Sequence, residues 1–282
     1  MQRLFRATAW MTLASLLYAQ APTVNTGGVV NDASYAPQAV APGSIVAIFG
    51  TNLASAVAIS DTIPLSTSLG SVTSVTFNNV PAPLYFVGPL QINAYLPYES
   101  LPSSTSTGTA NVVVNTNTGA SVAQTVNLVP TLPGIFTVNE QGTGQAIATD
   151  NADAALAAPT GSIPGASAHP FSISTQGQNG HALNIWCTGL GAITPPVAAG
   201  ANSYSNGKLV LRRTVAQSPD LAVLVGGVPA QILFAGLAPQ YVGEYQIDVL
   251  LGPGTPTGNA VPVQIQLNGV TTSANVTVAI TN

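Results

Sequence analysis

The sequence predicts an all-β protein built from two copies of one β-sandwich module. Composition, the spacing of apolar runs and an internal repeat predict this. Of 282 residues, only 5 are Lys or Arg and 9 are Asp or Glu, whereas 46% are hydrophobic and 27 are Gly and 22 Pro. This composition is too apolar for a disordered chain and too poor in charge for a coiled coil or helical bundle. Clustered Lys and Arg are missing, so we expect no nucleic-acid partner.

The apolar residues occur in short alternating runs. Gly, Pro or Asn interrupts these runs about every 8–12 residues, a spacing typical of β-sandwiches. In the first half the predicted strands are Ser44–Phe49, Val72–Asn78, Pro83–Val87, Gln91–Leu96, Thr109–Asn115 and Ser121–Val129. In the second half they are Ile135–Val138, Gln145–Thr149, Ala182–Thr188, Leu221–Val225, Gln231–Ala235, Tyr245–Leu251, Ala260–Leu267 and Thr271–Ile280. The best helix candidate, Asp153–Ala158, is too short to be stable alone.

The N-terminus has the features of a secretory signal. Met1–Ala19 begins with a positive segment containing Arg3 and Arg6 and continues with the apolar run Ala7–Tyr18. That run suits the hydrophobic part of a signal peptide and is too short to cross a bilayer. We expect cleavage before Gln20 and no membrane span in the mature chain. The sequence therefore predicts a secreted protein, either extracellular or on the cell surface.

The chain has a single cysteine, Cys187, so no intrachain disulfide can form. Leu183, Ile185 and Cys187 alternate along one predicted strand and therefore share a face. We expect this face to lie in the core and Cys187 to be a buried free thiol.

An internal repeat predicts the domain organisation. Asn79–Gly88 aligns with Gly227–Gly236, with Val, Pro, Ala, Phe and Gly at matching positions. Downstream of this segment, Gln91-Ile92-Asn93 matches Gln246-Ile247-Asp248. The same β-module therefore occurs twice, because apolar and turn residues recur in one order.

Four segments follow from the repeat. They are a signal peptide over 1–19, a first β-sandwich over 20–129, a linker over 130–133 and a second β-sandwich over 134–282. The linker, Pro130-Thr131-Leu132-Pro133, is short and stiff, which favours a fixed angle between the modules.

Particular motifs give the modules a resemblance to a known family. Pro42–Ser44, Gly50–Leu53 and Val75–Pro83 resemble the IPT/TIG immunoglobulin-like domain. A longer series of motifs, from Val30–Ser34 to Phe234–Pro239, resembles the uncharacterised Solibacter-type C-terminal module of secreted acidobacterial proteins. The resemblance covers nearly all of the mature chain. It implies two tandem immunoglobulin-like sandwiches and a secreted context, and it implies no activity.

Residues that could carry catalysis are scarce. The only candidate bases of a hydrolase triad are His169 and His181, and no Gly-x-Ser-x-Gly elbow is present. Glu99, Glu140 and Glu244 are the only glutamates, and the six aspartates are scattered, which disfavours a glycosidase carboxyl pair. We therefore expect no catalytic site, and the protein is predicted not to be an enzyme.

Metal and cofactor motifs are also weak. Asp150-Asn151-Ala152-Asp153 offers oxygen atoms that could suit calcium, but it lacks the spacing and closing Glu of an EF-hand. A hairpin tip is the favoured interpretation, because Asp and Asn side chains support turns. Gly142-Thr143-Gly144 lacks the third Gly of a dinucleotide fingerprint. No metal and no cofactor are predicted.

The recurring segments Gln91-Ile92-Asn93 and Gln246-Ile247-Asp248 favour a structural role. By strand alternation, each Ile can point into the core while its polar neighbours bind loop backbone.

The leading functional hypothesis is a non-catalytic secreted or cell-surface interaction module that binds an extracellular protein or glycan. The alternative is a purely structural extracellular spacer without a ligand, and an unrecognised hydrolase is a weaker third hypothesis. The second module carries an insertion between Gly236 and Gln246 that brings Tyr241 and Tyr245. These two residues are the candidate partner contacts, because Tyr offers a large contact area at little entropic cost. In the alternative interpretation, Tyr241 packs on its own sandwich and closes one end.

Overall fold

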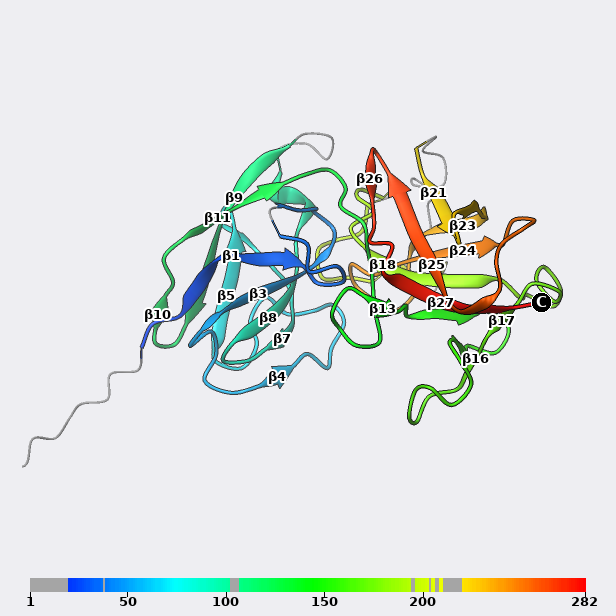
Figure 1. The fold of residues 1–282 in the computed structure, drawn as a ribbon. Coiled ribbons are helices and arrows are strands. Elements are labelled where there is room, and N and C mark those ends of the chain that lie inside the picture. Colours follow the sequence, from blue (N-terminus) through cyan, green and yellow to red (C-terminus); the bar gives the residue numbers. More distant parts are fainter. Residues whose placement is uncertain are drawn as a thin grey trace, which may run out of the picture.

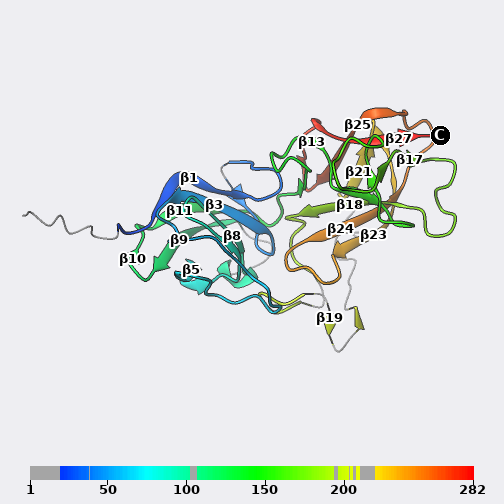
Figure 2. The ribbon, with the colours of Figure 1, turned by 90° about the horizontal axis from the view of Figure 1, so that it is seen from below.

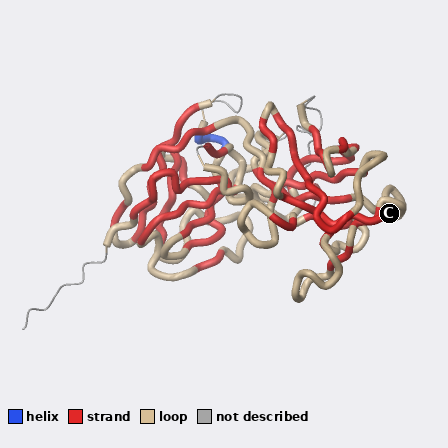
Figure 3. The backbone as a smooth tube through the Cα atoms, in the orientation of Figure 1, coloured by secondary structure: helices blue, strands red, loops and turns tan. Residues whose placement is uncertain are grey.

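The computed structural model describes residues 20–37, 39–101, 107–193, 196–202, 204–205, 208–209 and 220–282. The signal peptide predicted for Met1–Ala19 lies outside these residues. The described chain is almost entirely strand and loop, and its one helical segment is the 3₁₀ turn η1 (Tyr98–Ser100) (Figure 3). Figures 1 and 2 show two β-sandwiches side by side, as expected for tandem immunoglobulin-like modules. The predicted fold class is therefore confirmed.

Two sheets form the first sandwich. Sheet I has the order β1 (Thr23–Asn31), β3 (Ile45–Thr51), β8 (Gln91–Tyr95), β7 (Leu84–Val87) and β4 (Ala58–Ile59). Sheet II has the order β2 (Ala39–Val40), β11 (Gln124–Leu128), β9 (Gly108–Thr116), β5 (Val72–Phe77) and β6 (Val80–Pro81), and β10 (Gly119–Ala120) pairs with β9. The inward-facing side chains of both sheets form one core, which contains Ile48, Phe77, Leu84 and Ile92, each without exposed surface.

Two further sheets form the second sandwich. Sheet III has the order β16 (Ala168–His169), β15 (Leu156–Ala157), β14 (Ala148–Asp150), β18 (Leu183–Thr188), β24 (Tyr245–Leu250) and β23 (Gln231–Leu237), and β12 (Gly134–Ile135) pairs with β18. Sheet IV has the order β13 (Gly144–Gln145), β27 (Val276–Thr281), β25 (Gly258–Leu267), β21 (Ala222–Val225) and β22 (Val228–Pro229). β17 (Phe171–Ser172) and β26 (Val270–Thr271) extend sheet IV, and β19 (Tyr204–Ser205) and β20 (Lys208–Leu209) form a separate hairpin. The core of this sandwich contains Leu183, Ile185, Ile247 and Val249.

The internal repeat is visible in the strand register. In sheet I, Phe49 lies opposite Gln91, and Phe86 lies opposite Asn93. In sheet III the equivalent pairs are Trp186 with Gln246 and Phe234 with Asp248. The register shifts at the same place in both copies, between Leu84 and Phe86 and between Ile232 and Phe234. Matching sequence positions therefore occupy matching places on the two sheets.

Hydrogen bonds join the sandwiches beside the linker. In the described chain, every strand pairing joins strands on the same side of residues 130–133. The backbone N–H of Leu132 donates to the Gly189 carbonyl at 2.9 Å, and the Asn31 side chain donates to the Leu132 carbonyl at 2.9 Å. The backbone N–H of Ile45 donates to the Thr188 hydroxyl at 3.0 Å. The linker and both modules are therefore bonded to one another.

One local difference from the sequence predictions has a clear cause. β1 was not predicted, because Gly27 and Gly28 interrupt its alternation; the strand bulges between Val24 and Val29, where Gly27 has φ +69°. Asp153–Ala158 contains no helix, in agreement with the expectation that so short a segment is not stable alone: residues 151–153 form a turn that is followed by β15.

The Asp150 carboxylate accepts the Ala152 N–H at 3.0 Å, and the Asp153 carboxylate accepts the Ala155 N–H at 2.9 Å. These residues connect the antiparallel strands β14 and β15, so the hairpin tip predicted for Asp150–Asp153 is confirmed.

Cys187 is buried without exposed surface on the face that also carries Leu183 and Ile185, as predicted. Burial raises the pKa of its thiol, which disfavours the reactive thiolate. We expect native protein to react with a thiol reagent only when it unfolds. Labelling followed by mass spectrometry across a urea titration should track the unfolding transition. Rapid labelling in the absence of denaturant would contradict the assignment.

Candidate functional site

The two tyrosines expected at a contact surface lie in different environments. Tyr241 is 49% exposed and packs edge-on against Trp186, with ring centroids 5.7 Å apart. Tyr245 has no exposed surface, and its hydroxyl donates to the Gly191 carbonyl. The hydroxyl of Tyr98, from the first module, lies 2.8 Å from that of Tyr245. Tyr245 is therefore a contact between the modules, and an external partner cannot reach it.

A groove that the sequence did not predict lies over sheet I. It is a cavity of about 420 Å³ whose polar lining is Asp32, Gln91, Asn93 and Glu140. Tyr85 and Phe86 provide aromatic walls.

A second hollow of about 230 Å³ shares the four polar residues and adds Tyr35 and Phe136. Both modules contribute to these hollows, because Phe136 and Glu140 follow the linker.

Strand alternation places the polar lining. In β8 the side chains of Ile92 and Ala94 are buried in the core, so those of Gln91 and Asn93 lie on the outer face. The Gln91 amide donates to the Asn93 side-chain oxygen at 2.7 Å, and the Asn93 amide donates to the Asp32 carboxyl at 2.8 Å. The buried Ile92 confirms that part of the prediction. The flanking amides differ from the prediction, because they bind each other and a carboxyl group.

A turn after β1 fixes the position of Asp32. The Asn31 side-chain oxygen accepts the N–H groups of Ala33 at 2.9 Å and Ser34 at 3.0 Å. Asn31 also donates to the linker, so the turn is bonded to the junction. Asp32, Asn93 and Gln91 thus form a connected row, which we call the polar row.

Burial raises the pKa of Asp32 from 3.8 to about 6, opposed by the Asn93 hydrogen bond and assisted by the nearby charge of Glu140. Burial also raises the pKa of Tyr35 to about 12. Beside the junction, burial raises the pKa of Glu244 to about 7. The groove therefore contains a carboxyl group that takes up a proton more readily than an exposed aspartate.

We expect Asp32 to make the protein less stable as pH rises. Well below pH 3.8, Asp32 is protonated in both the folded and the unfolded state. Above pH 3.8 the unfolded state loses its proton first, so the free energy of unfolding falls with rising pH until the folded state also loses its proton near pH 6. A shift of about two pKa units corresponds to about 3 kcal/mol. Glu244 acts in the same direction up to about pH 7.

Urea unfolding at several pH values tests this expectation. Asp32→Asn should flatten the dependence between about pH 3.8 and 4.5, where Glu244 is protonated in both states, whereas Glu244→Gln should flatten it between about pH 6 and 7. An unchanged slope in Asp32→Asn would contradict the expectation.

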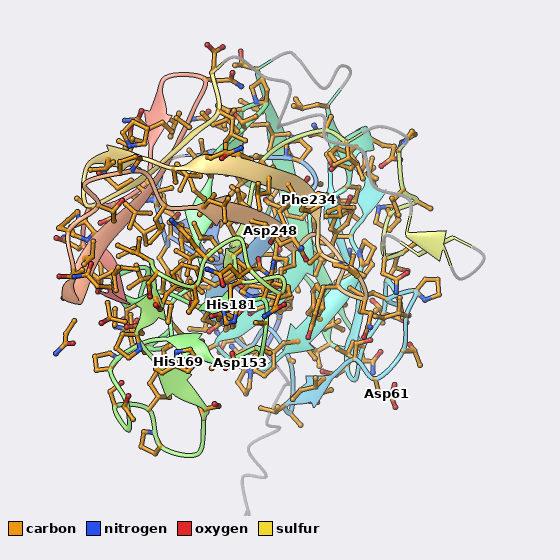
Figure 4. The ribbon with its side chains drawn as sticks, turned by 90° about the vertical axis from the view of Figure 1, so that its right-hand side faces the viewer. Asp61, Asp153, His169, His181, Phe234 and Asp248 are labelled. Carbon is orange, nitrogen blue, oxygen red and sulfur yellow. The ribbon has the colours of Figure 1, made fainter. Side chains whose placement is uncertain are left out.

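A related polar row exists on the outer face of sheet III. The Gln246 amide lies 3.4 Å from one Asp248 carboxyl oxygen, and Asn151 also bonds to Asp248. Burial raises the pKa of Asp248. Figure 4 shows Phe234 beside Asp248. In the first module the strand residue Asn93 bonds to the Asp32 carboxyl group, which lies in a turn. In the second module the carboxyl group is on the strand, at Asp248, and the amide is on the turn residue Asn151.

Both histidines contact the hairpin tip. His169 Nε2 bonds to the Asp153 carboxylate at 2.9 Å, and its Nδ1 lies 3.1 Å from the Pro170 carbonyl oxygen. The ring of His181 bonds to the buried Asp150 carboxylate at 2.8 Å. Asp150, Asp153 and His169 each place one possible metal ligand atom within 4.8 Å of the others.

The part of the chain that the structure describes contains no helix with the length and hydropathy needed to cross a bilayer.

No protein-family model matches the sequence, and no curated protein is significantly similar to it. Among solved structures, the plexin A4 extracellular region has 11% identity and a TM-score of 0.29, and the match covers 99% of this chain and 20% of that chain. The surface glycan-binding protein SGBP-B of Bacteroides ovatus, in complex with a mixed-linkage heptasaccharide, has 13% identity and a TM-score of 0.31, with 86% and 44% covered. A surface glycan-binding protein of Prevotella bryantii has 12% identity and a TM-score of 0.27, with 91% and 42% covered. This chain spans less than half the length of each.

Proposed function

We propose that this protein is a non-catalytic, secreted or cell-surface module that binds a neutral glycan in the groove beside Asp32. The observation that carries the proposal is the polar row of Asp32, Asn93 and Gln91 next to the aromatic side chains of Tyr85 and Phe86. The groove volume of about 420 Å³ lies in the usual range for a small-ligand site.

The chemistry of the polar row suits sugar hydroxyl groups. A hydroxyl can donate to the Asp32 carboxyl and accept from a side-chain amide N–H. Asn93 and Gln91 are already held by hydrogen bonds, so binding orders few side chains and costs little entropy. Phe86 offers an apolar aromatic surface for the C–H groups of a sugar ring. The small number of charged residues in the chain favours a neutral ligand over a highly charged one.

A screen of neutral oligosaccharides on a glycan array, followed by calorimetry, tests the proposal. Asp32→Asn weakens a charge-assisted acceptor, and Phe86→Ala removes an aromatic wall, so we expect each to weaken binding about tenfold. Asp61→Asn is the matched control, because Asp61 is exposed on the first module (Figure 4). Asp61 does not line the groove. Equal losses in Asp32→Asn and Asp61→Asn would contradict the proposal.

A second candidate function is glycoside hydrolysis. It is favoured by the presence of Asp32 and Glu140 in one groove, where the raised pKa of Asp32 suits a general acid. Chromatography of the bound oligosaccharide after incubation distinguishes the two functions, since binding alone leaves it intact. Absence of both binding and cleavage would favour the structural spacer, which the hydrogen-bonded junction also suits.

A further inference from the structure

Both histidines of the chain lie at one place in the fold. Among 282 residues there are two histidines, and each bonds to a carboxylate of the hairpin tip between β14 and β15. His169 Nε2 lies 2.9 Å from Asp153 Oδ2, and His181 Nδ1 lies 2.8 Å from Asp150 Oδ2. Figure 4 shows His169, His181 and Asp153 close together, away from Asp61. The two histidines and two of the few aspartates therefore lie together outside the groove.

From this arrangement we propose that Asp150, Asp153 and His169 form a binding site for a divalent transition-metal ion, with Zn²⁺ as the best-fitting ion. One ligand atom from each residue lies within 4.8 Å of the others. Zn²⁺ binds carboxylate oxygen and imidazole nitrogen at about 2.0–2.2 Å, so its ligand atoms lie roughly 3–3.5 Å apart. The side chains of Asp153 and His169 are 52% and 39% exposed, which leaves them room for this small contraction.

The hydrogen bonds of His169 identify its ligand atom. Nδ1 lies 3.1 Å from the Pro170 carbonyl oxygen, which can only accept, so Nδ1 carries the hydrogen. In the neutral ring, Nε2 then has a lone pair that faces Asp153 Oδ2, another acceptor. Two acceptors at 2.9 Å need a proton or a metal ion between them. A backbone carbonyl that holds the other ring nitrogen is the usual support of a metal-binding histidine.

Asp150 provides the fixed side of the site. Its side chain is 2% exposed, and its carboxylate accepts the Ala152 N–H at 3.0 Å and contacts His181 at 2.8 Å. His181 can therefore orient Asp150 as an outer hydrogen-bond partner without binding the ion itself.

The ligand set favours Zn²⁺ over Ca²⁺. Ca²⁺ takes six to eight oxygen ligands, whereas this set has two carboxylates and one imidazole nitrogen. From the sequence alone, calcium was only the weaker alternative to a hairpin tip at Asp150–Asp153, because the fold is needed to bring His169 to these residues from β16.

A bound ion would connect the hairpin tip to β16. The segment around β16 projects from the body of the second module (Figure 1). With a single cysteine, the chain cannot form a disulfide that would hold this segment. Metal binding to the folded state would therefore stabilise the fold.

Calorimetry and thermal unfolding of the EDTA-treated full chain with ZnCl₂ test the site. We expect one Zn²⁺ per chain, a higher melting temperature with Zn²⁺, and much weaker binding of Ca²⁺ and Mg²⁺. His169→Ala and Asp153→Asn should each weaken Zn²⁺ binding at least tenfold, while Asp61→Asn, the charge-matched control, should bind like the wild type.

The same variants distinguish a metal site from an ordinary ion pair. In EDTA, His169→Ala should melt close to the wild type, because an exposed pair contributes little stability. Absence of a Zn²⁺ response in the wild type would overturn the proposal, as would an undiminished response in His169→Ala. Neither result depends on glycan binding.

Discussion

Replacing Tyr245 with alanine is expected to lower the free energy of unfolding by about 4–5 kcal/mol. The side chain has no exposed surface and belongs to the core of the second module, and loss of a large buried aromatic side chain costs about 3–5 kcal/mol. The substitution also removes the hydroxyl that bonds to the Gly191 carbonyl and lies against Tyr98. Urea unfolding of the full chain measures the loss.

Two variants separate the contributions of ring and hydroxyl. Tyr245→Phe keeps the ring, and the Tyr98 hydroxyl can still donate to Gly191 at 3.1 Å, so a loss of about 1 kcal/mol is expected. Tyr241→Ala removes a half-exposed ring whose edge-on contact with Trp186 contributes about 1 kcal/mol. Equal losses in Tyr245→Ala and Tyr241→Ala would show that Tyr245 does not hold the core and the junction together.

The burial of Tyr245 could have been predicted from the sequence. Tyr245, Ile247 and Val249 alternate along one strand and share its inward face. In the alignment of the two repeats, however, Tyr245 falls at the end of the insertion before Gln246, which favours a loop contact. Alternation is the stronger signal because burial of one face determines the register of the strand.

The polar row could be predicted only in part. Gln91 and Asn93 are two residues apart, so alternation places both on one face. Asp32 is 61 residues from Asn93, and their contact depends on the pairing of β1, β3 and β8. Gly27 and Gly28 interrupt the alternation of apolar and polar residues in β1, so the sequence pattern does not predict this strand. The recurrence of Gln-Ile-Asn as Gln-Ile-Asp was the one available signal, since the exchange retains a hydrogen-bonding polar side chain.

The junction also depends on contacts that local patterns do not encode. Thr188 is 143 residues from Ile45, yet its hydroxyl accepts the Ile45 N–H at 3.0 Å and donates to the Gly243 carbonyl at 2.7 Å. The linker sequence suggested a fixed angle, and the structure adds hydrogen bonds on both sides of it.

Thr188→Val should lower the free energy of unfolding nearly as much as Tyr245→Ala, although valine has almost the same shape as threonine. Thr188 has no exposed surface, so the substitution leaves a buried N–H and a buried carbonyl without their partner. Each unsatisfied group costs about 1–3 kcal/mol, and we expect a total loss of about 3 kcal/mol by urea unfolding. Thr188→Ser retains the hydroxyl and should lose only about 1 kcal/mol, from the missing methyl group. If the Thr188→Val and Thr188→Ser variants were equally stable, the hydroxyl would not hold the modules together. A larger loss of stability in Thr188→Val shows that the hydrogen bonds of the Thr188 hydroxyl stabilise the junction.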